Sequence, residues 1–239
     1  MVTGGSRGIG FATAKILSEN GATVIITARN QERLEKSISK IPNSIGIAAD
    51  IRNSNDVKNV VNKTIEKFGR LDILVNNAGI FPKIKQLHEI DEDEWNEVLD
   101  VNLTGQFRFT KEAIPHLQKT SGSIINISSD AGIKAYQGFN ADAYSASKAA
   151  LILLTKCWAL EYSKDKIRVN CICPGVVDTD MTKPFMRTQK DKEFMNSEHP
   201  IGRIGQPDEI GKAVLYFASD DASWTTGAIL AVDGGESIK

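Results

Sequence analysis

The sequence predicts an α/β fold in which a doubly wound parallel sheet carries helices on both faces, within one domain spanning residues 1–239. A glycine-rich turn, TGGSRGIG at 3–10, opens the chain, and apolar runs of strand length then alternate with stretches of helical periodicity. Because parallel neighbours need a crossover connection, this alternation is typical of a parallel sheet. With 41% hydrophobic residues, a chain of this length can bury one large core.

Each element follows from its own pattern. Met1 and Val2 form a very short first strand, and the helix over 11–20 ends at Gly21, which suits a left-handed C-terminal turn. Apolar runs bounded by turn residues predict further strands at 22–28, 44–49, 72–77, 123–128, 167–173 and 227–233. Helical periodicity predicts helices over 30–40 and 54–68, from Asp91, over 143–163 and from 206, with Pro207 in the first turn. This is the order of a Rossmann-type sheet, whose ligands bind beyond the carboxyl ends of the strands.

Composition excludes several classes of partner. Lys and Arg number 29 against 30 Asp and Glu, so the formal net charge of −1 offers no excess to neutralise phosphates, and no nucleic-acid partner is expected. The longest apolar run, AALILL at 149–154, is far too short to span a membrane, and the N-terminus lacks the pattern of a secretory signal. A cytoplasmic protein with no membrane partner is expected. The three cysteines and three histidines lack metal-ligand spacing, so no metal is expected.

Two less patterned segments are expected to border the substrate. The polar stretch over about 180–205 indicates a mobile substrate loop with apolar anchors, and the second segment joins Ser129 to Tyr144. Six of their residues are candidates for an apolar lid over the reacting carbon: Tyr136, Phe139, Phe185, Met186, Phe194 and Met195. Simple coverage of the core is the equal alternative for these six.

The glycine turn is a candidate phosphate site. Gly4, Gly8 and Gly10 lie between the first strand and the first helix, where backbone N–H groups and the helix dipole favour a pyrophosphate. A glycine triplet alone is as consistent with an ordinary tight turn. The strand before it and the helix after it favour dinucleotide binding.

A tyrosine and a lysine form the candidate catalytic pair. Tyr144 and Lys148 in YSASK are four residues apart, hence on one face of a helix. A neighbouring ammonium favours the phenolate, so the pair suits general acid or base chemistry near neutral pH. Packing without chemistry is the alternative for two such residues.

Six motifs in register make a specific resemblance. TGGSRGIG at 3–10, NNAG at 76–79, DVNLTG at 100–105, NISS at 126–129, YSASK at 144–148 and PGVVDT at 174–179 follow the order and spacing of the short-chain dehydrogenase/reductase family. The resemblance covers essentially the whole chain. The chain resembles 3-oxoacyl reductases and sugar or alcohol dehydrogenases of that family in equal measure.

The resemblance implies an oxidoreductase that transfers a hydride between a nicotinamide cofactor and a ketone or secondary alcohol. A 3-oxoacyl thioester is one candidate substrate, and a sugar or polyol is the alternative. Tyr144 would exchange the proton with the substrate oxygen, while Lys148 would lower the pKa of Tyr144 and hold the nicotinamide ribose. Ser129 would hydrogen-bond the substrate oxygen, and Asn102 would position a water that relays protons. A nicotinamide-binding regulator without turnover and an interaction scaffold are the alternatives from other classes.

By the same resemblance, the cofactor would contact the glycine turn and the strand ends. The expected contacts are Gly4, Ser6, Arg7, Gly8, Ile9, Gly10, Arg29, Asp50, Ile51, Asn77, Ala78, Gly79, Tyr144, Lys148, Pro174, Gly175, Val177 and Thr179. Asp50 would lie near the adenine, and Val177 and Thr179 near the carboxamide.

NADP(H) is expected in preference to NAD(H). NAD-binding sheets of this design carry an acidic residue at the end of the second strand, about 20 residues past the glycines. Ala28 occupies that position here and Arg29 follows it, while Arg7 in the glycine turn is a second candidate to meet a 2′-phosphate. Glu32, the nearest acid, is expected one turn into the next helix and pointing away. A solvated rim is the alternative role of both arginines.

Two further expectations concern the first strand and the assembly. Members of the family carry several more residues before the glycine turn, so either residues upstream of Met1 are missing or the strand is truncated. A truncated central strand would leave hydrogen-bonding groups of both neighbouring strands unpaired, which favours missing residues or a misplaced start. The helix over 143–163 is apolar around most of its circumference and needs cover beyond the sheet. A homo-oligomer, tetramer or dimer as is usual in the family, is expected to provide it.

Overall fold

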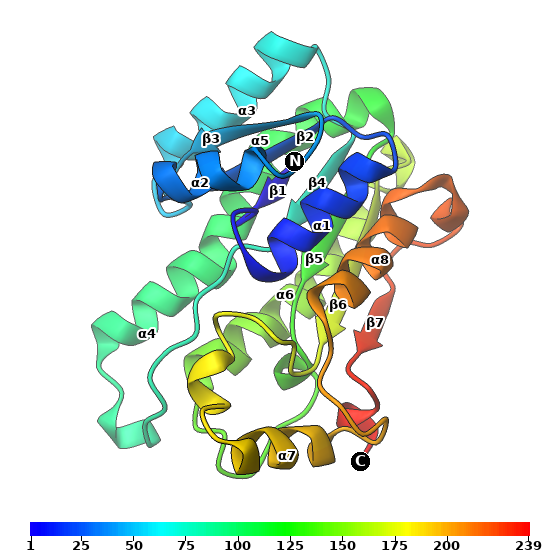
Figure 1. The fold of residues 1–239 in the computed structure, drawn as a ribbon. Helices are drawn as coiled ribbons and strands as arrows, with labels where there is room; N and C mark the ends of the chain where they lie inside the picture. The colour runs from blue at the N-terminus through cyan, green and yellow to red at the C-terminus, as the bar shows by residue number, and fades with distance from the viewer.

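The computed structural model describes residues 1–239, which form one seven-stranded sheet (Figure 1). Its strands are β1 (Val2–Thr3), β2 (Val24–Ala28), β3 (Ser44–Ala48), β4 (Ile73–Asn76), β5 (Ser123–Ile127), β6 (Arg168–Pro174) and β7 (Ile229–Val232). The spatial order is β3-β2-β1-β4-β5-β6-β7, and every neighbouring pair is parallel. The strands run outward in both directions from β1, which confirms the predicted doubly wound sheet.

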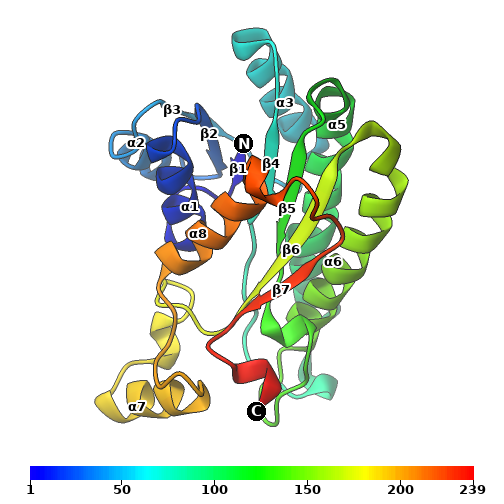
Figure 2. The ribbon, with the colours of Figure 1, turned by 90° about the vertical axis from the view of Figure 1, so that its right-hand side faces the viewer.

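Helices cover both faces of the sheet (Figures 1 and 2). One face carries α1 (Gly8–Glu19), α2 (Gln31–Ile38) and α8 (Pro207–Ala218), and the other carries α3 (Ser54–Phe68), α5 (Gly105–Thr120) and α6 (Asp142–Glu161). A further helix, α4 (Glu92–Leu99), continues through a π-helical turn, Asp100–Thr104, into α5. The helix predicted from Asp91 is therefore two helices joined by this turn.

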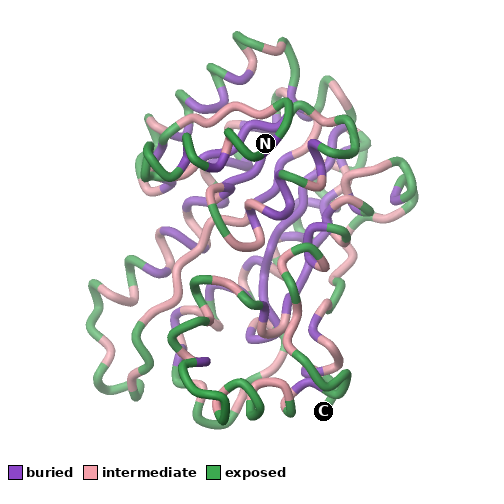
Figure 3. The backbone as a smooth tube through the Cα atoms, in the orientation of Figure 1, coloured by how far each residue is buried: buried purple, intermediate pink, exposed green.

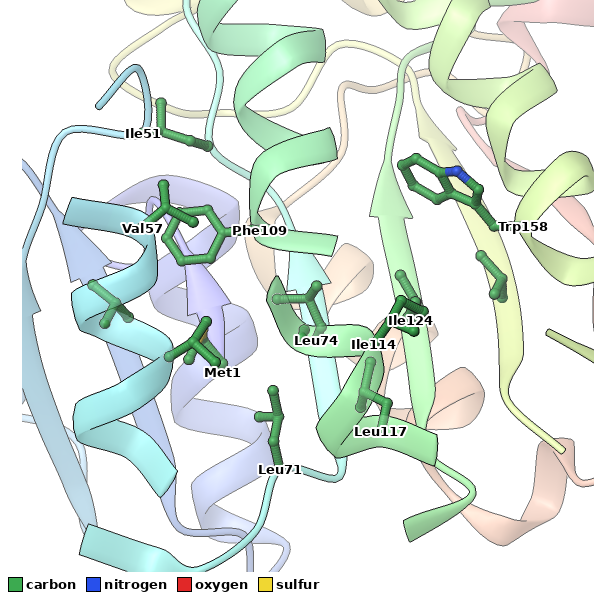
Figure 4. Close-up of a cluster of buried hydrophobic side chains, with 14 of the residues drawn as sticks. Met1, Ile51, Val57, Leu71, Leu74, Phe109, Ile114, Leu117, Ile124 and Trp158 are labelled. Atoms are coloured by element: carbon green, nitrogen blue, oxygen red, sulfur yellow. The ribbon is translucent and has the colours of Figure 1, made fainter. Parts of the chain in front are cut away.

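Alternate strand residues serve the two cores, as the pleat of a strand requires. Ile25 faces the core under α3, α5 and α6, whereas Ile26 faces the core under α1, α2 and α8. Figure 4 shows the first core, in which Phe109 and Trp158 pack above Leu74 and Ile124 of the central strands. The backbone of these strands is buried along most of its length (Figure 3).

The first strand consists of Val2 and Thr3, where the sequence predicts Met1 and Val2. Met1 still extends the pairing, because its carbonyl accepts a hydrogen bond from the Val75 N–H at 2.9 Å and its amino group donates to the Ile73 carbonyl at 2.7 Å. The short β1 therefore lies between β2 and β4, and the glycine turn begins at its carboxyl end.

The polar stretch 180–205, predicted as a loop, contains helix α7 (Gln189–Glu198). A capping box starts this helix: the Asp191 N–H donates to Thr188 Oγ1 at 3.1 Å, and the Thr188 N–H donates to Asp191 Oδ2 at 2.9 Å. Figures 1 and 2 place α7 at the same end of the molecule as the C-terminus. None of the helices combines the length and the apolar character that crossing a membrane requires.

Candidate active site

A cavity of about 310 Å³ opens at the carboxyl ends of the strands. All the predicted site residues line it except Asn102. Arg7, Arg29 and Arg33 line one region, and Ser129, Tyr144 and Lys148 line the same cavity from β5 and α6. The sheet therefore brings residues between Thr3 and Thr182 to one hollow, at the carboxyl ends of the strands, where such sheets bind ligands.

The glycine turn is shaped to admit a ligand close to the backbone. Gly4 and Gly8 have φ of 65° and 52°, in the left-handed region that favours glycine. A Cβ on Gly10 would lie 2.4 Å from the Gly4 carbonyl oxygen. Arg7, the residue before α1, makes no side-chain cap, so the helix N-terminus keeps donors for an anion. These residues fit the pyrophosphate of a dinucleotide.

The carboxyl end of β4 is tied to that of β1 by side-chain hydrogen bonds. Thr3 Oγ1 accepts the N–H groups of Asn77 at 2.9 Å and of Ala78 at 3.0 Å. In return, Asn77 Nδ2 donates to the Thr3 carbonyl at 2.8 Å. Asn77 thus has a structural role at the strand end in addition to lining the cavity.

Lys148 lies buried beneath the tyrosine. Its Nζ donates to the Ile127 carbonyl at 2.8 Å and lies 5.5 Å from the centroid of the Tyr144 ring. Ser129 follows β5 and donates its hydroxyl hydrogen to Asp130 Oδ1 at 2.8 Å. The three predicted catalytic groups therefore come together across β5 and α6.

Asn102 is fully buried in the π-helical turn and does not line the cavity. Its side chain is held by Ile80, whose N–H donates to Oδ1 at 2.8 Å and whose carbonyl accepts from Nδ2 at 3.0 Å. A Cβ on Gly79 would lie 3.4 Å from Asn102 Oδ1 and 3.7 Å from Lys148 Nζ, so the amide and the ammonium flank the same glycine.

Aromatic rings surround the tyrosine. The Phe81 ring lies 4.9 Å from that of Tyr144, 5.6 Å from Phe139 and 5.5 Å from Phe185, centroid to centroid. Of the lid candidates, Phe139 and Phe185 therefore lie close to Tyr144, whereas Phe194 on α7 is 60% exposed. Phe81 was missed because its segment carries no periodicity.

Comparison with known proteins decides the family. A family model described as "Enoyl-(Acyl carrier protein) reductase" matches residues 4–237. The 3-oxoacyl-[acyl-carrier-protein] reductase FabG of Thermotoga maritima is 38% identical over 98% of this chain and 96% of its own, and "Dehydrogenase/reductase SDR family member 4" of Caenorhabditis elegans is 37% identical over 98% and 93%. The chain is a short-chain dehydrogenase/reductase.

The names of other members of the family indicate different substrates. L-fucose dehydrogenase of Bos taurus is 37% identical over 100% of this chain and 88% of its own. The ligand-free structure of Thermoplasma acidophilum aldohexose dehydrogenase superposes with a TM-score of 0.91 at 35% identity, covering 100% of this chain and 93% of that one. This short-chain dehydrogenase/reductase is accordingly an NAD(P)-dependent oxidoreductase.

Burial moves the pKa values of Tyr144 and Lys148 in opposite directions. It raises the pKa of Tyr144 to about 12, and it lowers the pKa of Lys148 to about 8. Lys148 is expected from the sequence to lower the pKa of Tyr144, but the loss of solvent raises it, and the group that acts to lower it is the Ser129 hydroxyl. Both shifts favour the uncharged pair, a tyrosine that carries its proton and a lysine that gives its proton up readily.

Substitution of Gly10 by Ala tests the glycine cradle. The new Cβ would meet the Gly4 carbonyl and the Asn77 amide at 2.4 Å, so the turn has to open. We expect nicotinamide dinucleotide affinity, measured by fluorescence titration, to fall at least about tenfold, a loss of about 1.4 kcal/mol. Gly205→Ala is the control, because its Cβ would have ordinary contact at 3.4 Å with Val177. Equal affinity in both variants would remove the cradle from the binding site.

Proposed function

We propose that the enzyme uses NADP(H) and interconverts ketones and secondary alcohols. The observation that supports this is the shared cavity, in which Ser129, Tyr144 and Lys148 lie on the same hollow as three arginines and no unpaired acid. The bound cofactor would supply or accept the hydride. The glycine turn and the strand ends would hold it.

The chain's own residues handle the substrate oxygen and its proton. In reduction, Tyr144 donates its phenolic proton to the oxygen while Ser129 donates a hydrogen bond that stabilises the developing charge. Lys148, positioned by the Ile127 carbonyl, offers a positive charge beside the phenolate that remains. Asn102 keeps the backbone around Ile80 in place next to Lys148, which is the setting for the relay water.

The aromatic rings favour a substrate with an apolar group beside the carbonyl. Phe81, Phe139 and Phe185 present hydrocarbon next to Tyr144, which suits an acyl chain or an aliphatic ring better than a row of hydroxyls. A 3-oxoacyl thioester is the substrate class named for the Thermotoga relative, and cis-4-hydroxycyclohexanecarboxylate is named for a relative from Sinomonas cyclohexanicum that is 37% identical. A sugar or polyol, as in the L-fucose dehydrogenases, is the second candidate.

Tyr144→Phe tests the chemistry. The ring that packs on Phe81 stays, but the proton donor is lost, so we expect turnover to fall by about a factor of a hundred or more while cofactor binding persists. The assay is NADPH oxidation with 3-oxoacyl thioesters, cyclic ketones and keto sugars. Tyr162→Phe, the same change just after α6, should keep wild-type turnover. A Tyr144→Phe enzyme with near wild-type kcat would contradict the assignment, and a wild-type protein that binds NADPH but reduces nothing would favour a regulator.

The charges around the end of β2 favour NADP(H). Ala28 stands where an acid would repel a 2′-phosphate, and Arg29 and Arg33 line the cavity beside it. Glu32 on α2 pairs with Lys36 at 2.6 Å and is 77% exposed, outside the cavity lining. Arg33, missed in the sequence analysis, sits in the first turn of α2, and its N–H is held by the Asn30 side chain at 2.7 Å.

The two acids that do line the cavity are already paired. Asp50 binds Arg52 at 2.7 Å, and this guanidinium holds the pKa of Asp50 below its usual range. Asp180 is 3.6 Å from Arg7 and 3.0 Å from Lys183. Their charges are therefore compensated, and Arg29 and Arg33 remain available to a phosphate.

The double variant Ala28→Asp/Arg29→Ala tests this preference. The carboxylate introduced at position 28 would accept hydrogen bonds from the ribose hydroxyls of NADH, and the loss of Arg29 removes a charge-assisted contact with the 2′-phosphate of NADPH. We therefore expect the ratio of kcat/KM for NADPH to that for NADH to fall by about tenfold to a hundredfold, so that the preference reverses. Arg70→Ala, just before the amino end of β4 and outside the cavity lining, should leave the ratio unchanged. A wild type that uses NADH as well as NADPH would overturn the proposal.

We also propose a homo-oligomer, tetramer or dimer, formed through α5 and α6. Leu153 and Leu160, two turns apart on α6, are 63% and 80% exposed, and Phe107 on α5 is 48% exposed. Three large apolar side chains exposed on the same helical layer favour an interface in which a second copy of the chain buries them.

Leu160→Glu should shift the protein to a smaller species in light scattering after gel filtration, because a charge in an apolar interface is costly. The control is Leu87→Glu, which changes an equally exposed leucine on the short 3-10 helix Leu87–Glu89. A monomeric wild type, or the same mass for Leu160→Glu and wild type, would contradict the proposed interface.

A further inference from the structure

Asp130 is a buried acid directly beside the predicted catalytic serine. It is 7% exposed and begins the short 3-10 turn Asp130–Gly132 that follows β5. The turn lies tightly on α6, since a Cβ on Gly132 would meet the Lys148 backbone at 2.7 Å. The position of Asp130 relative to Ser129 and Tyr144 is therefore fixed by packing.

The Ser129 hydroxyl has only one hydrogen, and Asp130 accepts it at 2.8 Å. The same carboxylate oxygen, Oδ1, also accepts the Ala131 N–H at 2.8 Å. A hydroxyl that donates to Asp130 cannot donate to a substrate oxygen at the same time. The hydrogen must leave Asp130 before Ser129 stabilises a developing alkoxide.

The second oxygen of Asp130 faces other titratable groups. Tyr136, from the loop before α6, donates its hydroxyl to Oδ2 at 2.9 Å. Because Oδ1 already accepts two hydrogens, a proton taken up from solvent resides on Oδ2. The bond from Ser129 then goes to a neutral carboxyl, and such bonds are weaker than those to a carboxylate.

A charged pair lies next to Asp130. Glu236 Oε2 is 3.0 Å from His199 Nε2, and His199 Nδ1 is 2.8 Å from the Met195 carbonyl. Nδ1 must carry a hydrogen to meet that carbonyl, while the Val176 N–H approaches Nε2 at 3.3 Å, as it would a nitrogen without a hydrogen. The contact with Glu236 nevertheless raises the pKa of His199, and His199 lowers that of Glu236, so the pair favours an imidazolium and a carboxylate.

The remaining charged neighbours come from the elements packed on the turn. Tyr144 and Lys148 face it from α6, Cys173 from β6 and Asp233 from the C-terminal segment. Burial and the Glu236 carboxylate raise the pKa of Asp130 to about 6, while the hydrogen bond from Tyr136 lowers it. Asp130 therefore changes charge in a range in which Tyr144 does not.

We propose that Asp130 is a positioning residue that controls the direction of the Ser129 hydroxyl. The ionised carboxylate holds the hydrogen away from the substrate, and the neutral acid releases it to the substrate oxygen. Carbonyl reduction is therefore faster when Asp130 is protonated. The inference rests on the proposed function, in which Ser129 donates to that oxygen.

The rate of reduction is expected to fall as pH rises. As pH rises through about 6, Asp130 ionises, Ser129 is held more strongly, and kcat for reduction falls by about fivefold to tenfold. The titration of Lys148 near pH 8 would add a separate step at higher pH. Only the step near pH 6 belongs to Asp130.

The test is the pH profile of kcat for NADPH-dependent ketone reduction in Asp130→Asn. The asparagine keeps an acceptor for Ser129 and Ala131 but cannot ionise, so the step near pH 6 should vanish and kcat at pH 7.5 should exceed the wild-type value. Asp233→Asn is the matched control, because this carboxylate accepts the Gly235 and Ser237 N–H groups and does not touch Ser129. A step that persists in Asp130→Asn, or that disappears in Asp233→Asn, would overturn the proposal.

Two more variants should move the step in opposite directions. Tyr136→Phe removes a hydrogen bond to the ionised form, so the step moves to higher pH. Glu236→Gln removes the neighbouring negative charge, so the step moves to lower pH. If Asp130→Asn does not fold, these two variants test the proposal on their own. It would be refuted if the pH of the step did not change in either variant, or changed in the same direction in both.

A failure of the proposed function can be distinguished from a failure of the role of Asp130. If wild-type protein binds NADPH but reduces no ketone at any pH, the assignment of Ser129 and Tyr144 is wrong, and the role of Asp130 falls with it. If wild type turns over and Tyr144→Phe does not, an unchanged profile in Asp130→Asn refutes the role of Asp130 alone.

Discussion

Buried side-chain hydrogen bonds hold the carboxyl ends of the central strands together, and the site depends on them. Asn76 on β4 donates to Asn126 on β5 at 2.8 Å and to Thr110 on α5 at 2.9 Å, and Asn126 donates to Thr155 on α6 at 2.8 Å. The strands on which the cavity stands are thus tied to each other and to the helices behind them. Loss of one partner would leave a buried amide unsatisfied, at a cost of about 1–3 kcal/mol.

The same burial sets the chemistry. Lys148 is buried and Tyr144 is partly buried beside the cavity, and this loss of solvent disfavours phenolate and ammonium alike. Charge on either group therefore depends on partners that can compensate it. An enzyme that develops charge on a substrate oxygen benefits from such a site, because each oriented donor acts more strongly there than in water.

The two sides of the cavity differ in how they are built. The glycine turn and strand ends form a preorganised backbone surface, in which a Cβ has no room at Gly10. Tyr144, which lines the cavity on the other side, is surrounded by rings from separate segments that do not themselves line it: Phe81 after β4, Phe139 before α6 and Phe185 in the 3-10 turn Lys183–Phe185. Such connecting segments can vary without disturbing the sheet, and relatives of similar identity are named for different substrates.

The sequence by itself determined the doubly wound sheet and the glycine turn, because strand-helix alternation and glycine spacing are local patterns. The resemblance to the short-chain dehydrogenase/reductase family predicted most of the cavity-lining residues, but it missed Arg33 and included Asn102, which does not line the cavity. It misjudged α7 as a loop, since the capping box of Thr188 and Asp191 lies in a strongly polar stretch with weak periodicity. Only the tertiary structure decided the charge states and the neighbours. Burial, which raises the pKa of Tyr144, depends on packing throughout the molecule. The contacts that bring His199 and Glu236 to Asp130 and Tyr136 join segments far apart in the chain, and no spacing in the sequence encodes them.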